Sequence, residues 1–430
     1  MAETLAIDDA VGRAALRKAG WRLIPMIAFG YGLAYLDRAN ISFAALQMNR
    51  DLHFSATVYG FGAGLFFISY AACEIPSNLL LYRVGARRWF ARILLTWGLL
   101  AMGMMLVKTP LQFYIMRFLL GMAEAGFFPG VVFYLSQWFP AHMRARAISR
   151  FYVSLPASSV VMGIVAGALL DLQGKAGLAG WQWLFLLEGL PAVLLSFVFL
   201  FFLPDSPQEA RWLTAEERAW ILHHVKPIDG HTVKMGRALL DPRVWQISVL
   251  FLCGLTCSYA YVLSAPPILQ AITGLDNRNV GFLTAAMSLL GVAGMTLNAI
   301  HSDRTRERYL HIGIPFLIMA GGFLIGGLTV KPWLVVPALA LALGSYHALQ
   351  GPELALATSF LHGKSAAAGI AAMNTIGMLG GFIGPYGMGL VKDFSGSYQP
   401  GLLMLVLPCL VAATMVFMMR FQARAGRGLR

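Results

Sequence analysis

Long apolar stretches alternate with short polar turns along almost the whole chain. About twelve stretches have the roughly twenty residues that a helix needs to cross a hydrocarbon core of about 30 Å. They lie near 21–43, 56–82, 89–107, 111–138, 147–170, 181–203, 243–270, 279–300, 310–329, 333–358, 366–391 and 400–421. This pattern predicts an all-α integral membrane protein with twelve transmembrane helices.

The longest polar stretch divides the spans six and six. We expect an N-terminal tail over 1–20, a six-helix bundle over 21–203, a linker over 204–242, a second bundle over 243–421 and a tail over 422–430. Within the linker, "LTAEERAWILHHV" predicts an amphipathic helix, in which Thr214 is the N-cap and Glu217 closes a capping box.

Composition and charge placement agree with a membrane protein. The chain is 58% hydrophobic and 12% charged, whereas a soluble domain is about a quarter charged. The net charge of +13 first suggests a nucleic-acid partner. About 25 of the Lys and Arg residues, however, fall in the tails and in the loops on one side, and about 6 on the other, which is the asymmetry of the positive-inside rule. The charge therefore predicts topology, with both termini cytoplasmic, and no nucleic-acid binding.

The cysteines and glycines suggest packing rather than chemistry. Cys253 and Cys257 lie one helical turn apart, but no His or carboxylate stands beside them, so we expect no metal site, no disulfide framework and no cofactor. The glycines of "GMLGGFIGPYGMG" lack the strand–loop–helix context of a phosphate-binding loop, and small residues let membrane helices approach closely.

The two halves repeat a basic turn at the same place. "NLLLYRVGARR" follows the second span and "AIHSDRTRER" follows the eighth. Internal symmetry of this kind is typical of transporters that bind substrate at the midplane between two repeats.

These features resemble the major facilitator superfamily. Its loop motif is partly kept as Arg83, Gly85 and Arg87 in the first half and as Asp303 and Arg304 in the second, residues for which the resemblance implies a gating role. "YLDRANIS", "EIPSNLLLYRVGARRW", "RFLLGMAEAGFFPG", "LEGLPA" and "NTIGMLGGFIGPY" are similar to the anion:cation symporter family. The resemblance implies the major facilitator fold, with two pseudo-symmetric six-helix bundles. It also implies import of an organic carboxylate with protons across a bacterial inner membrane. Because six spans on each side suffice to form a pathway, we expect the chain to work as a monomer.

Five charged residues lie within the apolar spans of the first half: Asp37, Arg38, Glu74, Arg117 and Glu124. Charges at a helix centre cost on the order of 2.5–3.5 kcal/mol each, so they pair or line a water-filled pathway. Arginine offers a permanent, forked charge that matches a carboxylate, and a carboxylate buried among apolar groups can exchange protons near neutrality.

Spacing predicts how these charges face. Arg117 and Glu124 are seven residues apart and share a helix face, whereas Asp37 and Arg38 diverge by about 100°. We expect Arg38 to face the cavity and Asp37 to face Arg117 and Glu124. The resemblance implies that Arg38 and Arg117 interact with the anion or hold the network, and that Asp37 and Glu124 couple protons.

Other candidates are neutral or lie in the second half. The resemblance places Tyr35, Tyr70 and Asn374 at the anion site, and we interpret Glu74 and Glu188 as structural or gating acids. Where sugar-acid members of the family carry aromatic pairs, this chain has Leu263–Ser264 and Glu353–Leu354, which favours a bulkier or differently shaped acid. Tyr259, Tyr261 and His347 remain to donate hydrogen bonds. Glu353 is either a second proton site, a partner for a substrate hydroxyl or a helix-end acid facing water.

Two alternatives within transport remain open: sodium coupling and exchange. A proton-driven drug exporter is disfavoured because "SLPASSVVMGIVAGALL" lacks the exporters' glycine–proline motif. A membrane enzyme would need a nucleophile–base pair or a metal cluster, and a sensor would need a soluble signalling domain; the sequence indicates neither.

Overall fold

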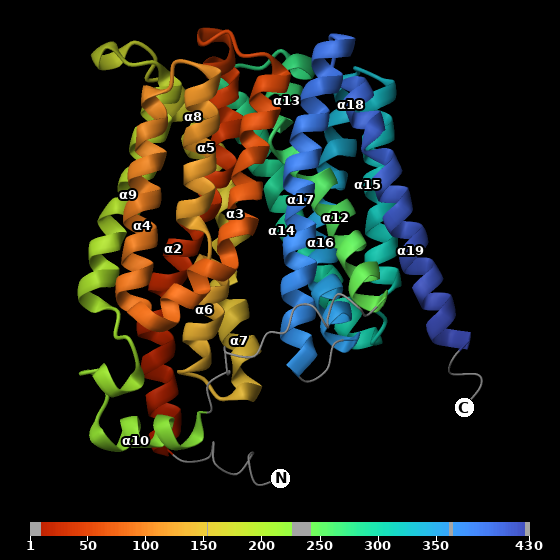
Figure 1. The fold of residues 1–430 in the computed structure, drawn as a ribbon. Helices are drawn as coiled ribbons and strands as arrows, with labels where there is room; N and C mark the ends of the chain where they lie inside the picture. Colours follow the sequence, from red (N-terminus) through yellow and green to blue (C-terminus); the bar gives the residue numbers. More distant parts are fainter. Residues whose placement is uncertain (1–9, 153, 226–241, 361–363, 426–430) are drawn as a thin grey trace.

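The computed structural model describes residues 10–152, 154–225, 242–360 and 364–425, and its long elements are α-helices (Figure 1). In the first half the helices are α2 (Ala10–Asp51), α3 (Ala56–Val84), α4 (Ala86–Gly103), α5 (Pro110–Glu124), α6 (Phe127–Ser136), α7 (Ala141–Tyr152), α8 (Ser154–Leu170), α9 (Gly180–Phe202) and α10 (Ala215–His224). In the second half they are α12 (Pro242–Val262), α13 (Ala265–Thr273), α14 (Asn277–Thr305), α15 (Leu310–Leu328), α16 (Pro332–Phe360), α17 (Lys364–Ser395), α18 (Gln399–Met404) and α19 (Val406–Ala425).

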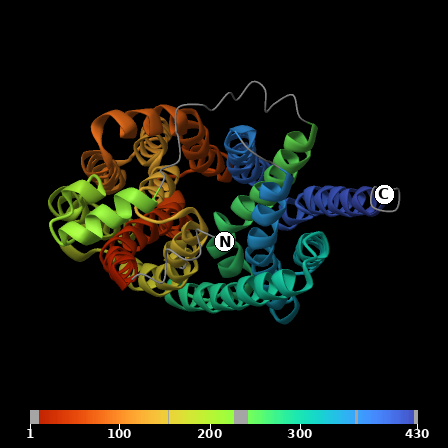
Figure 2. The same cartoon turned by 90° about the horizontal axis from the view of Figure 1, so that it is seen from below.

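The helices form two bundles, each with its own apolar core. One core is built almost entirely from α2 to α10 and the other from α12 to α19, and the view from below separates the red-to-lime helices from the green-to-blue ones (Figure 2). Within the described residues, nine helices are long and apolar enough to cross a membrane by length and composition. The three other expected spans correspond to α2, to α7 with α8, and to α17. Large apolar side chains such as Leu194 and Leu297 point outward, 58% and 68% exposed, as lipid-facing positions require.

Two of the predicted spans consist of two helices each, with a break between them. The span over 111–138 breaks at Ala125, whose carbonyl accepts a bond from the Ser77 hydroxyl at 2.6 Å. Gly126 follows with φ +87°, and a Cβ there would clash with the Ser77 side chain. The span over 243–270 breaks at Leu263 and Ser264. A neighbouring helix can satisfy the backbone groups that such a break frees inside a membrane.

The linker helix is docked on the first bundle. Thr214 and Glu217 form the predicted capping box of α10, which is confirmed. Glu217 also forms an ion pair with Lys18 of α2 at 2.7 Å, and the Trp220 ring covers Gly12 so closely that a Cβ would not fit. The segment expected as a tail is therefore helical from Ala10 onward, because it packs against α10.

The two bundles meet closely at the end away from α10. Gly60 of α3 lies against the backbone of Pro385 in α17, and Gly163 of α8 lies against Gly281 of α14, each too close for a larger side chain. Toward the α10 end, the ribbons of the two bundles diverge (Figure 1).

Candidate functional site: a cavity between the two bundles

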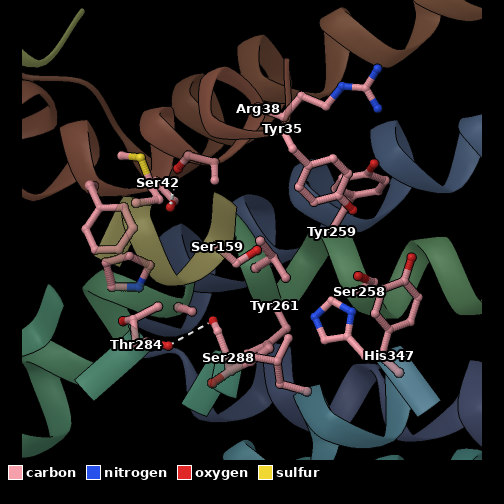
Figure 3. Close-up of a pocket in the computed structure, with 18 residues that line it drawn as sticks. Tyr35, Arg38, Ser42, Ser159, Ser258, Tyr259, Tyr261, Thr284, Ser288 and His347 are labelled. Carbon is pink, nitrogen blue, oxygen red and sulfur yellow. Dashed lines mark hydrogen bonds between the residues drawn. The ribbon is translucent and has the colours of Figure 1, made fainter. Parts of the chain in front are cut away.

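A cavity lies between the halves, and helices of both halves line it (Figure 3). The first half contributes Tyr35, Arg38, Ala39, Ser42 and Phe43 from α2, with Ser159 and Met162 from α8. The second half contributes Ser258, Tyr259, Tyr261, Val262, Ala265, Pro266, Thr284, Ser288, Leu343, Tyr346 and His347. Among these described residues only Arg38 carries a permanent charge.

Arg38 is held by a buried ion pair. Its Nε donates to Oε1 of Glu124 at 2.8 Å and its Nη2 lies 2.5 Å from the same oxygen. Glu124 is the last residue of α5, directly before the break at Ala125, and it is fully buried. Oε2 of Glu124 has no hydrogen-bond partner among the described residues. One charge on the cavity wall is therefore neutralised by one carboxylate behind it.

Aromatic rings support both arginines. The Arg38 guanidinium lies 4.8 Å from the ring centre of Tyr70 and 5.5 Å from that of Phe66. The Arg117 guanidinium lies 4.9 Å from the same Phe66 ring and donates to the carbonyl of Ala63 at 3.3 Å. Cation–π contacts of this kind hold a charge in place without neutralising it. Tyr70 thus lies beside Arg38, the candidate residue for binding the anion. Arg117 does not line the cavity and lies behind its wall.

Arg38 and Asp37 face the sides that were predicted for them. Arg38 lines the cavity, and Asp37 lies close enough to Arg117 and Glu124 to interact electrostatically with both. The direct ion pair with Glu124, however, is made by Arg38. Asp37 accepts a bond from Asn40 of its own helix at 3.2 Å, and its Oδ2 has no partner among the described residues. Asp37 and Arg117 interact electrostatically, but no ion pair joins these two described side chains.

Asn374 and Glu74 join the halves near the cavity. The Asn374 amide donates to both carboxylate oxygens of Glu74, at 3.1 and 3.0 Å. Asn374 is on α17 and Glu74 on α3, so this contact crosses between the bundles. Both carboxylate oxygens of Glu188, on α9, are buried without a partner among the described residues.

Hydroxyl groups and one imidazole form the wall of the second half. The rings of Tyr35 and Tyr259 lie next to each other, with Tyr261, Ser258 and His347 further along the cavity (Figure 3). The Tyr261 hydroxyl and the His347 Nδ1 are buried without a partner among the described residues. Ser159, Ser258, Thr284 and Ser288 also line the cavity, although they were not predicted as site residues. Their signal in the sequence is a small polar residue inside an apolar helix.

Glu353 lies apart from this wall. It sits on α16, seven residues before the helix ends, and is only 5% exposed. The alternative of a helix-end acid facing water is therefore wrong. It does not line the cavity, and its Oε1 has no partner among the described residues.

The expected gating residues lie in the two basic turns. Gly85 has φ +93° between α3 and α4, where a Cβ would meet the Asp205 carboxylate. Arg87 pairs with Asp205 at 3.5 Å, and its backbone N–H donates to the same side chain at 2.7 Å. In the second turn Asp303 pairs with Arg308 at 2.6 Å. Arg83 and Arg304 are exposed.

Two helical bundles with a cavity between them are the arrangement of a membrane transporter. In the part of the chain that the structure describes, no three His, Cys, Asp or Glu side chains gather as a metal site would require. The model of the Major Facilitator Superfamily matches residues 27–385, and the chain belongs to this family.

Named relatives agree with this assignment. The chain is 43% identical over 410 residues to a protein of Agrobacterium vitis named "Putative tartrate transporter", covering 94% of this chain and 91% of that one. It is 38% identical to the quinolone resistance transporter of Acinetobacter baumannii, covering 94% of each. Among solved structures, a bacterial homologue of the human lysosomal transporter Spinster, in an inward-facing and unoccupied conformation, matches with a TM-score of 0.78 at 16% identity. That match covers 96% of this chain and 97% of the homologue.

Proposed function

We propose that this transporter imports an organic carboxylate together with protons by alternating access. The observation that carries the proposal is the Arg38–Glu124 pair, in which the one permanent charge on the cavity wall is neutralised by a buried acid. A substrate carboxylate and Glu124 compete for the same guanidinium. Arg38 pairs with Glu124 when Glu124 is ionised, and with the substrate carboxylate when Glu124 is protonated.

A proton on Glu124 would release Arg38 for the substrate. Protonation removes the acceptor charge, so the forked donor set of Arg38 becomes free to bind a carboxylate in two-pronged fashion. Loss of the proton restores the pair and expels the anion. Burial disfavours a charged carboxylate unless a cation is near, so substrate binding and protonation of Glu124 support each other.

We assign Asp37 and Arg117 a supporting part in this cycle. Both are buried, 3% and 1% exposed, and neither touches the cavity in this conformation. When Arg38 turns to the substrate, Arg117 is the remaining cation near Glu124 and Asp37. Glu353 supplies a second protonation site in the other half.

The wall of the second half selects the carboxylate. Tyr259, Tyr261 and His347 present donors from the second half, and Leu263 and Ser264 form the break between α12 and α13, whose neighbours Val262 and Ala265 line the cavity. Two relatives are named for compounds of very different size, tartrate and quinolone, so these names do not indicate how large the transported acid is. A thermal-shift screen against hydroxy diacids, aldonates and aromatic acids would identify it, because a bound ligand stabilises the fold.

We infer that the α10 end faces the cytoplasm of a bacterial cell and that one chain forms the pathway. Both ends of the described chain lie at the α10 end (Figure 1), where the basic turns also lie, as the positive-inside rule requires. The cavity is completed by two halves of one chain, so no second copy is needed to build it.

Uptake into proteoliposomes tests the proposal. We expect uphill uptake of the acid from the screen when a pH gradient is imposed. Glu124→Gln should abolish this uptake while counterflow exchange continues, because the neutral amide keeps the shape of the site and cannot lose a proton. Uphill uptake by Glu124→Gln at the parent rate would contradict the proton role.

A sodium gradient imposed at equal pH serves as the second arm. Accumulation driven by sodium alone would favour sodium coupling, and exchange without response to either gradient would favour an exchanger. In either case the Arg38 site would remain the anion site and only the coupling would change.

A further inference from the structure

One carboxylate of the second half caps a helix of the first half, at the end away from α10. Asp393, in the last turn of α17, accepts through Oδ1 from the backbone N–H of Ala56 at 3.0 Å and through Oδ2 from that of Thr57 at 2.7 Å. Ala56 and Thr57 open helix α3. The first N–H groups of a helix lack partners within the helix, so Asp393 fills a role that usually belongs to a residue of the same helix.

The contact joins charge to a helix dipole. The N-terminus of a helix carries a partial positive charge that favours an anion. Partial burial raises the pKa of Asp393, but hydrogen bonds from Thr57, Ala56 and Ser55 outweigh it, so the pKa lies below its usual value. The neighbouring Lys392 turns away, toward the carbonyl of Gly396 and the ring of Tyr398. Asp393 is therefore a charged acceptor aimed at α3.

Further along the pair, α3 and α17 approach each other closely at glycine positions. Gly389 lies against the carbonyl of Ala56, Gly60 against that of Pro385, and Gly64 against Phe382. Such close approach gives van der Waals contact but no directed bond. A second polar link at this end runs from the Tyr59 hydroxyl to the carbonyl of Leu263 at 2.7 Å. Hydrogen bonds therefore add to a close helix–helix contact that the glycines make possible.

Helix α3 does not need Asp393 for its own stability. Ser55 is the N-cap residue, and its hydroxyl accepts from the N–H of Val58 at 3.2 Å. This local cap persists whether or not α17 is near. The bond to Asp393 is consequently available as a contact between the halves rather than as part of the helix.

We propose that Asp393 is the latch that holds this end of the transporter shut. The proposal rests on the alternating access proposed above: when this end opens, α17 moves away from α3 and the two backbone N–H groups return to water. Asp393 is a positioning residue for the closed state. It does not touch the substrate cavity.

The distance between spin labels across this end tests the latch. Lys108 and Lys331 are exposed, lie in turns of the two different halves and can be replaced by labelled cysteines once the native cysteines are removed. Loss of a helix cap changes an equilibrium by about 0.5–2 kcal/mol, so Asp393→Asn should raise the ratio of open to closed distances by about 2- to 30-fold. The amide keeps the size of the side chain and lacks the charge.

Asp276→Asn is the matched control. Asp276 also caps a helix at this end, but through the N–H of Asn279 in its own α14, so the variant should leave the distance ratio unchanged. Ala56→Pro is the second variant, because it deletes one donor at the helix position that tolerates proline best. Ser55 is already extended, at φ −68° and ψ 162°, as the residue before a proline must be. Ala56→Pro should shift the ratio in the same direction as Asp393→Asn.

The outcomes separate the latch from the transport proposal. The label distances are measured without substrate or gradient, so a failure of proton coupling would leave this test intact. An Asp393→Asn distribution identical to the parent would overturn the latch. An equal shift from Asp276→Asn would also overturn it, since any lost cap at this end would then suffice.

Discussion

The two halves share one architecture but differ in how they treat charge. The first half buries Asp37, Arg38, Arg117 and Glu124 together, and ties the charge on the cavity wall to an acid behind it. The second half faces the cavity with hydroxyls and an imidazole, and its own buried acid, Glu353, lies away from the cavity. The difference indicates a division of labour, in which one half handles the anion and the proton and the other half recognises the rest of the substrate.

Removing the charge of Arg38 should have the largest effect on substrate affinity. Arg38→Ala leaves the substrate without a cation, and truncating one partner of a buried charge pair costs about 2–5 kcal/mol, or about 30- to several thousand-fold in substrate affinity. Calorimetric titration with the acid from the screen measures it. Arg50→Ala is the control, because that side chain is 80% exposed in an outer turn. Substrate affinity within twofold of the parent for Arg38→Ala would remove Arg38 from the site.

The acid of the second half provides the next test. Glu353→Gln should keep uphill uptake but lower the coupling by about one proton per substrate, since it removes a protonation site and no ion pair. The ratio is measured from the pH gradient that just balances a known substrate gradient. If the ratio stays at the parent value, Glu353 has only a packing role and proton handling belongs to the first half alone.

A smaller effect is expected from the hydroxyl wall. Tyr261→Phe removes a hydroxyl that has no partner among the described residues. Substrate affinity should fall by about 2- to 13-fold, the equivalent of one neutral hydrogen bond of about 0.5–1.5 kcal/mol, while the unfolding temperature should not fall. Tyr134→Phe is the matched control: its hydroxyl donates to the carbonyl of Pro204 at 2.8 Å, so it should lower stability and spare affinity. The reverse pattern would place the Tyr261 hydroxyl in the fold rather than in the site.

The docked linker of the first half should give the smallest effect, on stability alone. Burial raises the pKa of Glu217, but bonds from Lys18 and Thr214 outweigh it, so the pKa is lower in the folded protein. This contribution is complete above the unfolded-state pKa of about 4.3 and is lost as the pH falls through the folded value. Glu217→Gln should therefore cost at most about 1 kcal/mol at pH 7.

Thermal unfolding from pH 7 to pH 3 measures this contribution, and Glu216→Gln, exposed on the same turn, is the control. A Glu217→Gln deficit that is as large at pH 3 as at pH 7 would show that shape rather than charge is lost.

Hydropathy predicted the helices well, because a lipid core leaves the backbone few alternatives. Hydropathy alone does not mark the breaks after Glu124 and at Leu263, since the residues around both are apolar; Gly126 and the pair Pro266–Pro267 were the local signals for them. Those breaks depend on contacts from distant helices, such as the bond from Ser77 to Ala125.

Spacing found the charged residues but not their partners. A step of about 100° separates Asp37 from Arg38, yet it does not say which of them a neighbouring helix meets. In the structure α5 meets both: Arg38 forms the ion pair with Glu124, and Asp37 interacts electrostatically with Arg117 and Glu124. The contact of Asp393 with α3 joins residues 337 positions apart, and no local pattern indicates it.

The number of protons taken up when substrate binds tests the central claim most directly. It is obtained by calorimetric titration of the purified protein with substrate, in buffers that differ in their heat of ionisation. The titrations are run at one pH at which Glu124 is ionised and paired with Arg38. The account predicts that Glu124→Gln takes up about one proton fewer per bound carboxylate than the parent does, because proton and substrate binding are linked through that side chain. Equal proton uptake by the parent and by Glu124→Gln would contradict it.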